Sequence, residues 1–543
     1  MQALLALCCL AGVRGGPVSA YLTSLAGARL APQPPIPWTS SPGTPADATL
    51  VLDRSRAFQR MLGFGSALTE SAAYNYAQLN SSMQQTVLDL LYAPPPLGNG
   101  YALGRMHMNS ADFSLSTYSM DNETDDFTLS SFDTALQHDS AYVLPFALAA
   151  TARSGGALKT FFSPWSPPGW MKRSGSMINS SWPTGLRPEA GVHAAWALYF
   201  CKYALALRSK GLAPWGLTIQ NEPLIAMLNP AHLYESCAYT AEEERDFLRD
   251  HLGPALASAG LGDLVVMAYD WNKGQLASYT GTQLADSAAL QYLGGAAVHW
   301  YAWRGSLYLD QLQALAAAPG WNASKHVLLA TEACFIQQGV AQGAGGGEPG
   351  NDGTGVLIGP GPAPGNGSVA ARYGVGELYL LDALGDIAFG AQGWVDWNAL
   401  LDYRGGPNHI GRSDISAPIL VDAATNSLYV QSMYYYIGQL SRFVPPGWAR
   451  VGFAAASAGL AATSDQFNAL KLHVEQNLPN PPASKPPAVQ LCAAAAFASP
   501  SGQQGAVVVL NVLPRPFTVR VEDAALGAFN ATLPPRSAMT FVW

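Results

Sequence analysis

Charged side chains are scarce in this sequence. They make up 12% of its 543 residues, about half of the roughly 25% typical of soluble domains. The formal net charge is −8, and no run of Lys and Arg stands out that could neutralise a row of phosphates. The composition therefore argues against nucleic acid as a partner, and we expect a surface rich in Ala, Gly, Ser and Pro.

Cysteine is scarce as well. Two of the six cysteines, Cys8 and Cys9, lie in the first twenty residues. The others are Cys201, Cys237, Cys334 and Cys492. Their spacing is too wide for a zinc site, and four cysteines are too few for a disulfide framework. The sequence leaves room for one disulfide bridge but does not indicate its partners.

Several motifs of other enzyme classes are missing. The sequence has no GxSxG nucleophile elbow and no GxxxxGK[ST] phosphate loop, and His299 has no partner at metal-ligand spacing. Residues 345–350 match GxGxxG, but no predicted strand precedes them and no predicted helix follows, so they do not indicate a dinucleotide site. We therefore expect neither a cofactor nor a metal ion.

Long apolar runs are confined to the start of the chain. Residues 3–13 are apolar and residues 18–20 read Val-Ser-Ala, so residues 1–20 resemble a secretory signal peptide that lacks the usual initial positive charge. The alternative is a buried helix of the mature protein. No other segment reaches the roughly 18 apolar residues of a membrane span. Six N-x-S/T acceptors fit a glycoprotein of the secretory pathway, namely Asn80, Asn122, Asn179, Asn322, Asn366 and Asn530.

Short apolar runs alternate with longer amphipathic segments through the middle of the chain. The eight runs span residues 58–65, 101–106, 158–162, 216–220, 264–268, 295–299, 327–330 and 390–395. This alternation predicts an α/β fold, a (β/α)8 TIM barrel, over residues 57–439. Within it, residues 336–368 are low in complexity and rich in Gly and Pro, and they predict a surface loop.

The chain changes character on either side of this region. Residues 21–46 are rich in Pro, Ser and Thr and precede a short predicted strand. Near the carboxyl terminus, residues 507–512, 517–521 and 537–543 read as strands separated by turn residues. We therefore predict an appended all-β sandwich, built from an N-terminal segment, residues 21–56, and from residues 440–543.

Two glutamates stand at the ends of predicted barrel strands. Glu222 follows the apolar run at residues 216–220, and Glu332 follows the run at residues 327–330. Barrel enzymes carry their catalytic groups at the carboxyl ends of the strands, so both side chains would face one cleft. Glycosidic cleavage needs such a pair, because one carboxyl group protonates the leaving oxygen and the other attacks or activates water. The alternative is that both glutamates only cap strands or form ion pairs.

The same rule, a polar or aromatic residue soon after an apolar run, selects further candidates. They are Arg105, Asp112, Trp165, Asn221, His299, Tyr301, Trp397 and Asn398. Aromatic faces can stack on the apolar side of a sugar ring, while Asp and Asn can bind its hydroxyl groups. The set therefore predicts a sugar site.

Apart from Arg105 and Asp112, these residues and the two glutamates belong to five motifs. They are Ser163–Pro167 (SPWSP), Thr218–Pro223 (TIQNEP), Val298–Tyr301 (VHWY), Ala330–Cys334 (ATEAC) and Gly393–Asn398 (GWVDWN). In this order and at these intervals, the motifs resemble those of the lysosomal glucosylceramidases, in family 30 of the glycoside hydrolases. The resemblance extends from about Phe58 to the carboxyl terminus.

The resemblance implies a barrel with a β-sandwich, and retaining hydrolysis of glucosylceramide to glucose and ceramide, in the lysosome or vacuole or outside the cell. It implies Glu222 as general acid/base and Glu332 as nucleophile. The other implied roles are Asn221 on the 2-hydroxyl group, Asp112, Trp165 and Trp397 around the glucose, Tyr301 orienting Glu332, and Arg105, His299 and Asn398 in support. A glycolipid substrate also implies transient contact with a membrane surface, and an activator protein is a further conceivable partner.

The chain departs from the family pattern near the expected pocket mouth. The family's cysteine-rich amino-terminal segment is missing, and the loop at residues 336–368 replaces a shorter one. Arg412 stands where a sugar-contacting asparagine is expected. These changes leave the reaction type alone and concern lipid access and activator contacts.

Two other functions stay open. A family 30 endo-glycanase acting on β-1,6-glucan or xylan would use the same two carboxylates. A carbohydrate-binding relative without catalysis is disfavoured because Glu222 and Glu332 are both present.

Overall fold

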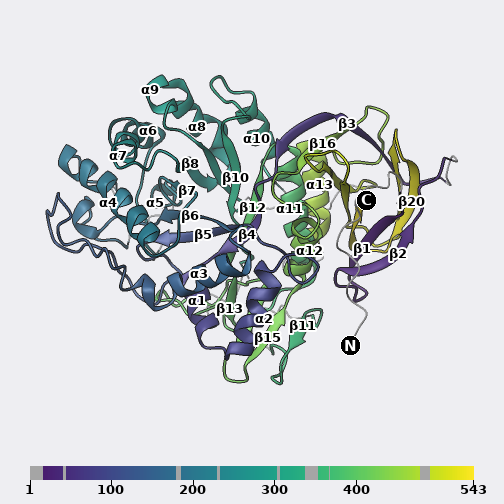
Figure 1. Cartoon of the computed structure of the whole chain (residues 1–543), viewed down its shortest axis with the longest axis horizontal. Coiled ribbons are helices and arrows are strands. Elements are labelled where there is room, and N and C mark those ends of the chain that lie inside the picture. Colours follow the sequence, from purple (N-terminus) through teal and green to yellow (C-terminus); the bar gives the residue numbers. More distant parts are fainter. Residues whose placement is uncertain are drawn as a thin grey trace.

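The computed structural model describes residues 16–40, 45–178, 185–228, 233–301, 306–336, 352–365, 367–476, 478 and 489–543. Its central feature is a closed barrel of eight parallel strands (Figure 1). The strands are β4 (Gly63–Ala67), β5 (Leu103–Met108), β6 (Lys159–Pro164), β7 (Gly216–Thr218), β8 (Val265–Asn272), β9 (Gly295–His299), β10 (Val327–Glu332) and β12 (Gly393–Asn398). All eight match the predicted runs in order, and the predicted barrel is confirmed.

A glycine allows strands β4 and β5 of the barrel to approach each other. A Cβ atom on Gly65 in β4 would lie 1.8 Å from the carbonyl oxygen of Leu103 in β5. Only a residue without a side chain allows β4 and β5 to pair here, with Gly65 opposite Leu103.

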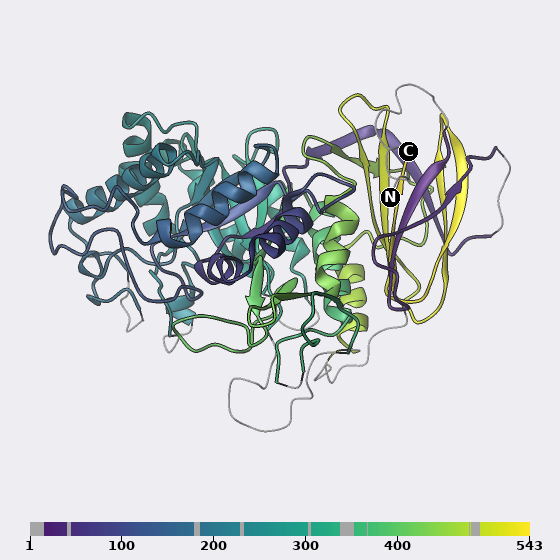
Figure 2. The same ribbon diagram turned by 60° about the horizontal axis from the view of Figure 1, so that its bottom comes forward.

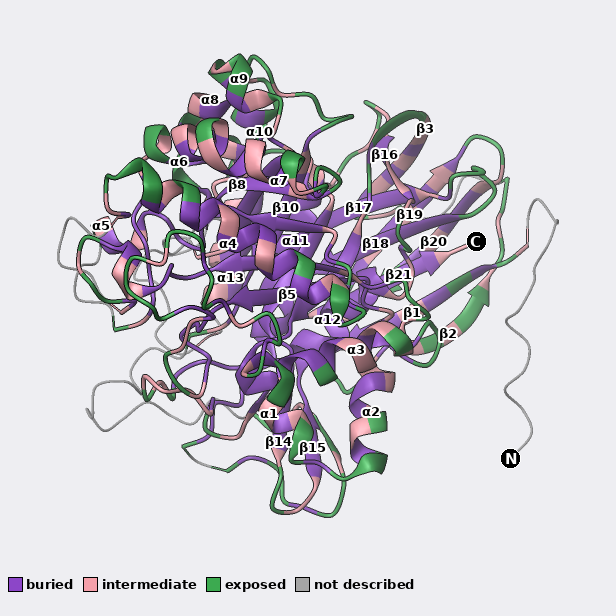
Figure 3. Ribbon diagram, turned by 60° about the vertical axis from the view of Figure 1, so that its left-hand side comes forward, coloured by how far each residue is buried: buried purple, intermediate pink, exposed green. Residues whose placement is uncertain are grey.

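Helices surround the barrel and present their apolar faces to it. In Figure 3 the barrel strands are buried, whereas the exposed positions gather on the outer faces of helices and on loops. The helices are α1 (Glu70–Ala77), α2 (Ser81–Tyr92), α3 (Val143–Arg153), α4 (Ala190–Ser209), α5 (Ile225–Leu228), α6 (Ala241–Phe247), α7 (Gly253–Ser258), α8 (Leu276–Ala285), α9 (Ser287–Leu290), α10 (Leu309–Ala316), α11 (Gly374–Ala388), α12 (Ser432–Ser441) and α13 (Ser464–Glu475). Short 3₁₀ turns lie at residues 139–141, 169–171 and 273–275, and a π-helical turn lies at residues 248–252. None of the described helices is long and apolar enough to cross a membrane.

A nine-stranded sheet forms the second body of the molecule (Figure 2). Its strands are β1 (Val18–Ser24), β2 (Ala31–Ile36), β3 (Ala48–Arg60), β16 (Ala449–Phe453), β17 (Ala493–Ala498), β18 (Gly505–Asn511), β19 (Phe517–Asp523), β20 (Gly527–Leu533) and β21 (Ser537–Val542). Both chain ends contribute, as predicted. The sheet folds over on itself, because the rings of Phe529 in β20 and Phe541 in β21 lie 5.1 Å apart although their strands are far apart in the sheet order.

Helices α11, α12 and α13 lie between the barrel and the sheet (Figure 1). Helix α13 lies within residues 440–543, which the sequence predicted as all-β. The contact includes a charged pair, because Arg536 in the turn before β21 donates to the buried carboxylate of Glu377 in α11 at 2.6 and 3.0 Å. Burial raises the pKa of Glu377, although Arg536 partly opposes this change.

The structure moves two predicted boundaries. Strand β1 begins at Val18, which is fully buried and pairs with Ile36, so the predicted signal-peptide end at residue 20 falls inside the sheet. The reason is the alternation of Val18, Ala20 and Leu22, whose side chains all face the core. Residues 1–15 lie outside the described part. Residues 57–60, predicted as barrel, are the end of β3 and pair with β16.

Part of the Gly/Pro-rich segment is a strand instead of a loop. Residues 356–358 form β11 (Val356–Ile358), which pairs antiparallel with β15 (Ser427–Val430). With β13 (Leu400–Asp402) and β14 (Ile419–Asp422) they build a four-stranded sheet. Val356 and Ile358 are β-branched and favour a strand, although the surrounding segment is rich in Gly and Pro. Residues 337–351 lie outside the described part.

Candidate active site

Alternation along the barrel strands delivers the polar side chains to one end of the barrel. Six apolar side chains pack together in its interior, namely Leu103, Phe161, Met267, Ala297, Leu329 and Val395. Side chains two residues apart on a strand point to the same face. Arg105, His299 and Trp397 each follow one of these apolar residues by two positions. The interior therefore changes from apolar to polar toward the carboxyl ends of the strands.

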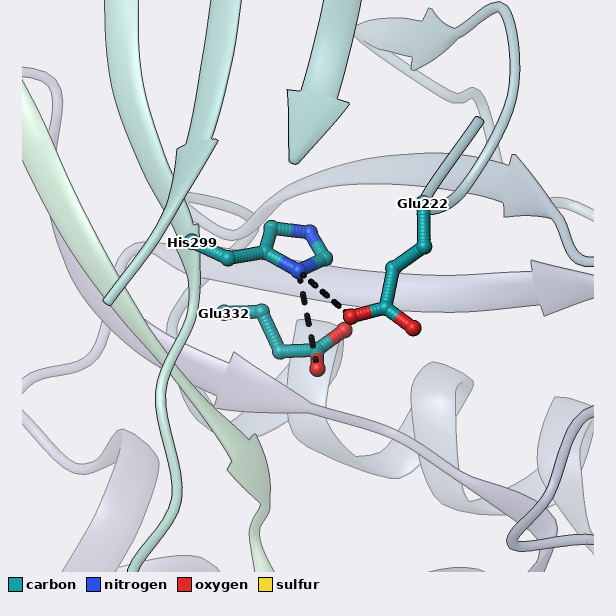
Figure 4. Close-up of side chains that lie close together, drawn as sticks. All are labelled: Glu222, His299 and Glu332. Carbon is teal, nitrogen blue, oxygen red and sulfur yellow. Dashed lines mark ion pairs between the residues drawn. The ribbon is translucent and has the colours of Figure 1, made fainter. Parts of the chain in front are cut away.

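The two predicted glutamates meet at this end (Figure 4). Glu332 ends β10, and Glu222 follows β7 with a left-handed backbone (φ 50°) that is costly for a residue other than glycine. One carboxylate oxygen of each glutamate and a ring nitrogen of His299 lie within 4.8 Å of one another. Both side chains are buried, with 8% of Glu222 and 6% of Glu332 exposed.

The two carboxylates have different partners. Glu332 forms an ion pair with the buried guanidinium of Arg105 and accepts a hydrogen bond from the Tyr301 hydroxyl at 2.9 Å. Glu222 has no arginine or lysine partner among the described residues and accepts from the Tyr234 hydroxyl at 2.8 Å. The positive charge of Arg105 thus stabilises a negative charge on Glu332 and none directly on Glu222.

A buried aspartate lies beneath the glutamates and ties their partners together. Asp270 is fully buried and accepts from Arg105 (2.8 Å), from His299 (3.0 Å) and from the hydroxyls of Thr218 and Thr331 (2.6 Å each). An irregularity in β8 before Trp271, with Asp270 at φ 40°, places this carboxylate inside the barrel. Four donors from four strands therefore converge on one side chain.

The charges of this cluster favour a protonated His299. Burial alone would lower the pKa of His299, but Glu332 and Asp270 outweigh burial and raise it to about 9. Burial would raise the pKa of Asp270, but Arg105 and His299 hold it well below its usual value. His299 Nδ1 lies 3.4 Å from Glu222 and 3.8 Å from Glu332 (Figure 4). One positive charge thus lies between the two carboxylates.

Glu222, His299 and Glu332 also have the types of ligand atom that hold metal ions. A histidine ligand must be neutral. With a pKa of about 9, His299 carries a proton on each ring nitrogen at neutral and acidic pH and offers no lone pair. A metal ion at this place would therefore have to displace a proton from His299.

A cavity of about 180 Å³ opens above the two glutamates. Within the described residues it is smaller than the roughly 300–1,000 Å³ of sites for drug-sized ligands. The rings of Trp165 and Trp397 in its wall stack with centroids 5.0 Å apart, and Arg105 lies 4.8 Å from the Trp165 ring. Because these rings pack against each other and against Arg105, they line the cavity with only 2% of Trp165 and 3% of Trp397 exposed.

Asp112 is the second unusual acid of the cavity. Its Oδ1 atom is buried without a hydrogen-bond partner among the described residues. Burial raises the pKa of Asp112 to about 8; Glu332 and Glu222 add to this effect, and Arg412 opposes it. Asp112 is therefore protonated in acid and can both donate to a ligand and accept from it.

The structure brings together most of the predicted site. Glu222, Glu332, Asp112, Trp165, Tyr301 and Trp397 line the cavity. Asn221 is not among the lining residues; its Oδ1 accepts from Arg105 at 2.7 Å. Asn398 accepts from the Thr69 hydroxyl at 2.7 Å and has no described contact with either glutamate. Asn398 therefore supports the start of α1 instead of the carboxylates.

Several cavity residues were not selected from the sequence. Tyr234, Trp271, Asn272, Ile225, Ile336 and Ile415 line the cavity, and so does Arg412, which the sequence singled out only as a departure. Asp270 comes soon after the fifth apolar run, so the rule used for the glutamates could have found it. Tyr234 lies in a loop, and no sequence signal marks it.

The four described cysteines are all buried and unpaired. No disulfide bridge joins the described residues, so the one bridge that the sequence allowed does not form among these four cysteines. Cys334 lines the cavity, and its sulfur lies 3.0 Å from the Tyr301 hydroxyl. Burial raises the pKa of the Cys334 thiol well above its usual value, so this cysteine is a poor nucleophile.

Comparison with known proteins agrees with this geometry. Residues 61–342 and 367–444 match the glycosyl hydrolase family 30 TIM-barrel domain. The chain belongs to glycosyl hydrolase family 30. It is 34% identical to a Caenorhabditis elegans protein named "Putative glucosylceramidase 4" over 81% of this chain and 78% of that protein. It is 27% identical to the lysosomal acid glucosylceramidase of Mus musculus over 91% of this chain and 83% of that protein.

This family 30 glycosidase also resembles enzymes of another specificity. It is 29% identical to an endo-1,6-beta-D-glucanase of Neurospora crassa over 76% of each chain. Among solved structures, SrfJ from Salmonella typhimurium matches with a TM-score of 0.77 at 25% identity, over 97% of this chain and 99% of that chain. The family, the fold and the glycosidase class are thus established, and the substrate is a separate question.

Proposed function

We propose that this family 30 glycosidase hydrolyses glucosylceramide to glucose and ceramide by double displacement. The observation that carries the mechanism is the unequal environment of the two carboxylates. Arg105 pairs with Glu332 only, whereas each carboxylate accepts from one tyrosine and lies near His299. Retaining glycosidases hold their carboxyl groups about 5 to 5.5 Å apart, closer than the roughly 6.5 to 9.5 Å of inverting ones. Oxygens of Glu222 and Glu332 within 4.8 Å support the retaining type.

In the first step, a Glu332 oxygen forms a bond to the anomeric carbon as the bond from that carbon to the ceramide oxygen breaks. Glu222 gives its proton to the leaving oxygen, so ceramide departs as a neutral alcohol. In the second step, Glu222 takes a proton from water, and the water oxygen displaces Glu332 to release glucose. The charges of Arg105 and His299 stabilise the Glu332 carboxylate before and after each turnover.

Apolar side chains at the cavity support a lipid aglycone. Ile225, Ile336 and Ile415 line it. Leu228 at the end of α5 and Leu233 in the following loop are 63% and 68% exposed. The chains of ceramide would bury such surface, at a gain of roughly 25 cal/mol per Å² of apolar area.

The second candidate is endo-hydrolysis of β-1,6-glucan, which the likeness to the Neurospora enzyme favours. An endo-acting enzyme must hold sugar residues on both sides of the cleaved bond, so it requires subsites beyond the cavity of about 180 Å³. The test compares turnover of glucosylceramide, galactosylceramide and β-1,6-glucan. We expect glucosylceramide to be preferred, and faster release of glucose oligomers from β-1,6-glucan would contradict the proposal.

The roles of the two glutamates are tested separately. Glu332→Gln should abolish turnover of every β-glucoside. Glu222→Gln should slow ceramide release but spare the first step with an aryl glucoside whose leaving group needs no proton, and azide should replace water in the second step. Glu377→Gln, at the distant ion pair with Arg536, is the control for a lost buried carboxylate. Turnover by the Glu332 variant at the wild-type rate would refute the assignment.

We also propose that the enzyme enters the secretory pathway, reaches the lysosome or vacuole and contacts membrane surfaces transiently. Whether an activator protein binds it is a separate question. The likeness to a mouse enzyme named lysosomal supports the location. Asn80, Asn122 and Asn322 are exposed, which supports glycosylation there. Mass spectrometry of the secreted protein before and after glycosidase treatment tests both the modification and the removal of a leader.

A further inference from the structure

One loop contributes an arginine to the lining of the cavity. The loop covers residues 405–414 and ends at Arg412 and Asp414. The Asn408 side chain binds the Arg412 backbone on both sides, accepting from its N–H at 2.7 Å and donating to its carbonyl at 2.8 Å. The backbone of the residue that enters the cavity is thereby fixed.

Neighbouring elements fix the rest of the loop. His409 donates its backbone N–H to the Ser114 carbonyl at 2.9 Å, and its ring lies 3.2 Å from the buried carboxylate of Glu235. Asn75 in α1 donates to the Gly406 carbonyl at 2.8 Å. Hydrogen bonds and an ion pair thus hold the loop against neighbouring elements at several points. A surface loop that only contacts solvent would not need these contacts.

The guanidinium of Arg412 is oriented by a second acid. Nε and Nη2 donate to Asp414 at 2.9 and 3.2 Å. Nη1 has no hydrogen-bond partner among the described residues, and Arg412 lines the cavity. Because Asp414 already balances the charge, the free edge of this guanidinium suits a neutral oxygen better than an anion.

Asp112 lies within the electrostatic reach of Arg412 in the same cavity. Its Oδ1 atom is a buried oxygen without a partner among the described residues, and Arg412 acts to lower its pKa. A hydroxyl group between the two side chains would accept from Arg412 and exchange a hydrogen bond with Asp112. Both unused polar atoms would then be satisfied.

We propose that Arg412 is a specificity-determining residue that donates a hydrogen bond to a hydroxyl group of the bound sugar, together with Asp112. This inference rests on the proposed function only in assuming that a neutral sugar occupies the cavity. A site built to bind a hydroxyl group rejects the analogue that lacks it, because its polar atoms are left unpaired. Arg412 therefore makes the cavity selective for a sugar with that hydroxyl in place.

The test crosses enzyme variants with substrate variants. Wild type and Arg412→Met are assayed with an aryl β-glucoside and with its 2-, 3-, 4- and 6-deoxy analogues. A hydrogen bond to a charged group predicts that Arg412→Met lowers kcat/KM for the parent glucoside by roughly 10- to 100-fold. For one deoxy analogue, the two enzymes should differ by less than about threefold, because the partner hydroxyl is already absent.

Arg404→Met is the matched control, because Arg404 directly precedes the loop but is exposed and has no ion pair among the described residues. An equal loss by Arg412→Met on the parent and on every analogue would overturn the proposal, as would no loss at all. Faster cleavage of an aryl glucoside 6-phosphate than of the neutral glucoside would also overturn it.

Two further measurements test the proposal if Arg412→Met does not fold or if hydrolysis cannot be measured. If Arg412→Met does not fold, Arg412→Lys retains a charge for Asp414 but loses the free edge, and the same analogue should show the coupling. Calorimetric binding of D-glucose and its deoxy forms gives the same comparison without hydrolysis. Failure of the wild type to cleave any aryl glucoside would contradict the proposed function, whereas the binding comparison would still test Arg412.

Discussion

Replacing Asp270 by Asn should damage both the stability and the chemistry of this enzyme. The substitution removes the charge that pairs with Arg105 and His299, and it turns one acceptor oxygen into an amide that faces two donors. Breaking a buried ion pair by removing one partner costs about 3–5 kcal/mol. Folded proteins have about 5–15 kcal/mol of stability in all. The variant should therefore fold but unfold at a clearly lower urea concentration.

The loss of activity should exceed what unfolding explains. Arg105 would lose its partner below Glu332, and a misplacement of about 1 Å at a reacting group can cost on the order of 100-fold in rate. We expect kcat of the folded variant to fall by about that factor with little change in KM. Glu377→Gln is the matched control, because it should lower stability by a similar amount through Arg536 but leave kcat unchanged.

The pH dependence separates a charge effect from a packing effect. Glu332 and Asp270 raise the pKa of His299 to about 9 against burial, above its value of about 6.5 in the unfolded chain. This contribution to stability is present below pH 6.5 and is lost as the pH rises toward 9. Without Asp270 this contribution should be smaller, and its loss should be complete at a lower pH. An Asp270→Asn variant with unchanged kcat, or with the wild-type profile of stability against pH, would refute this account.

Three further predictions concern single positions. Burial raises the pKa of Asp112 from about 3.9 to about 8, so the wild type should lose stability as the pH rises through this range, and Asp112→Asn should lose clearly less; urea unfolding at pH 4, 6 and 8 checks this. Glu235 raises the pKa of His409 against burial, so His409→Gln should cost on the order of 1 kcal/mol at pH 5 and little at pH 8.5, and an equal cost at both values would contradict the ion pair. Gly65→Ala should prevent folding, because the new Cβ would collide with Leu103, whereas Gly262→Ala, with no atom within 4 Å, should behave as wild type in circular dichroism.

The barrel could be predicted from the sequence because each strand is buried on both faces. Such strands read as continuous apolar runs, and their order along the chain is their order around the barrel. The sequence did not predict correctly where the barrel begins. The segment at residues 58–65 contains the end of β3 and the start of β4, and only pairing with β16 separates the two. Similarly, Val356–Ile358 became a strand because β15 offered it an edge.

The sequence by itself predicted the barrel and the sandwich built from both chain ends. It also predicted the two glutamates as candidate catalytic residues, because the end of a strand is a local feature of the chain. Only the tertiary structure decided how the glutamates differ. The pairing of Arg105 with Glu332, the position of Asp270 beneath both, and the placement of Tyr234 and Arg412 in the cavity depend on contacts between residues far apart in the chain. Charge, burial and hydrogen bonding assign chemical roles, and these properties exist only after distant strands have met.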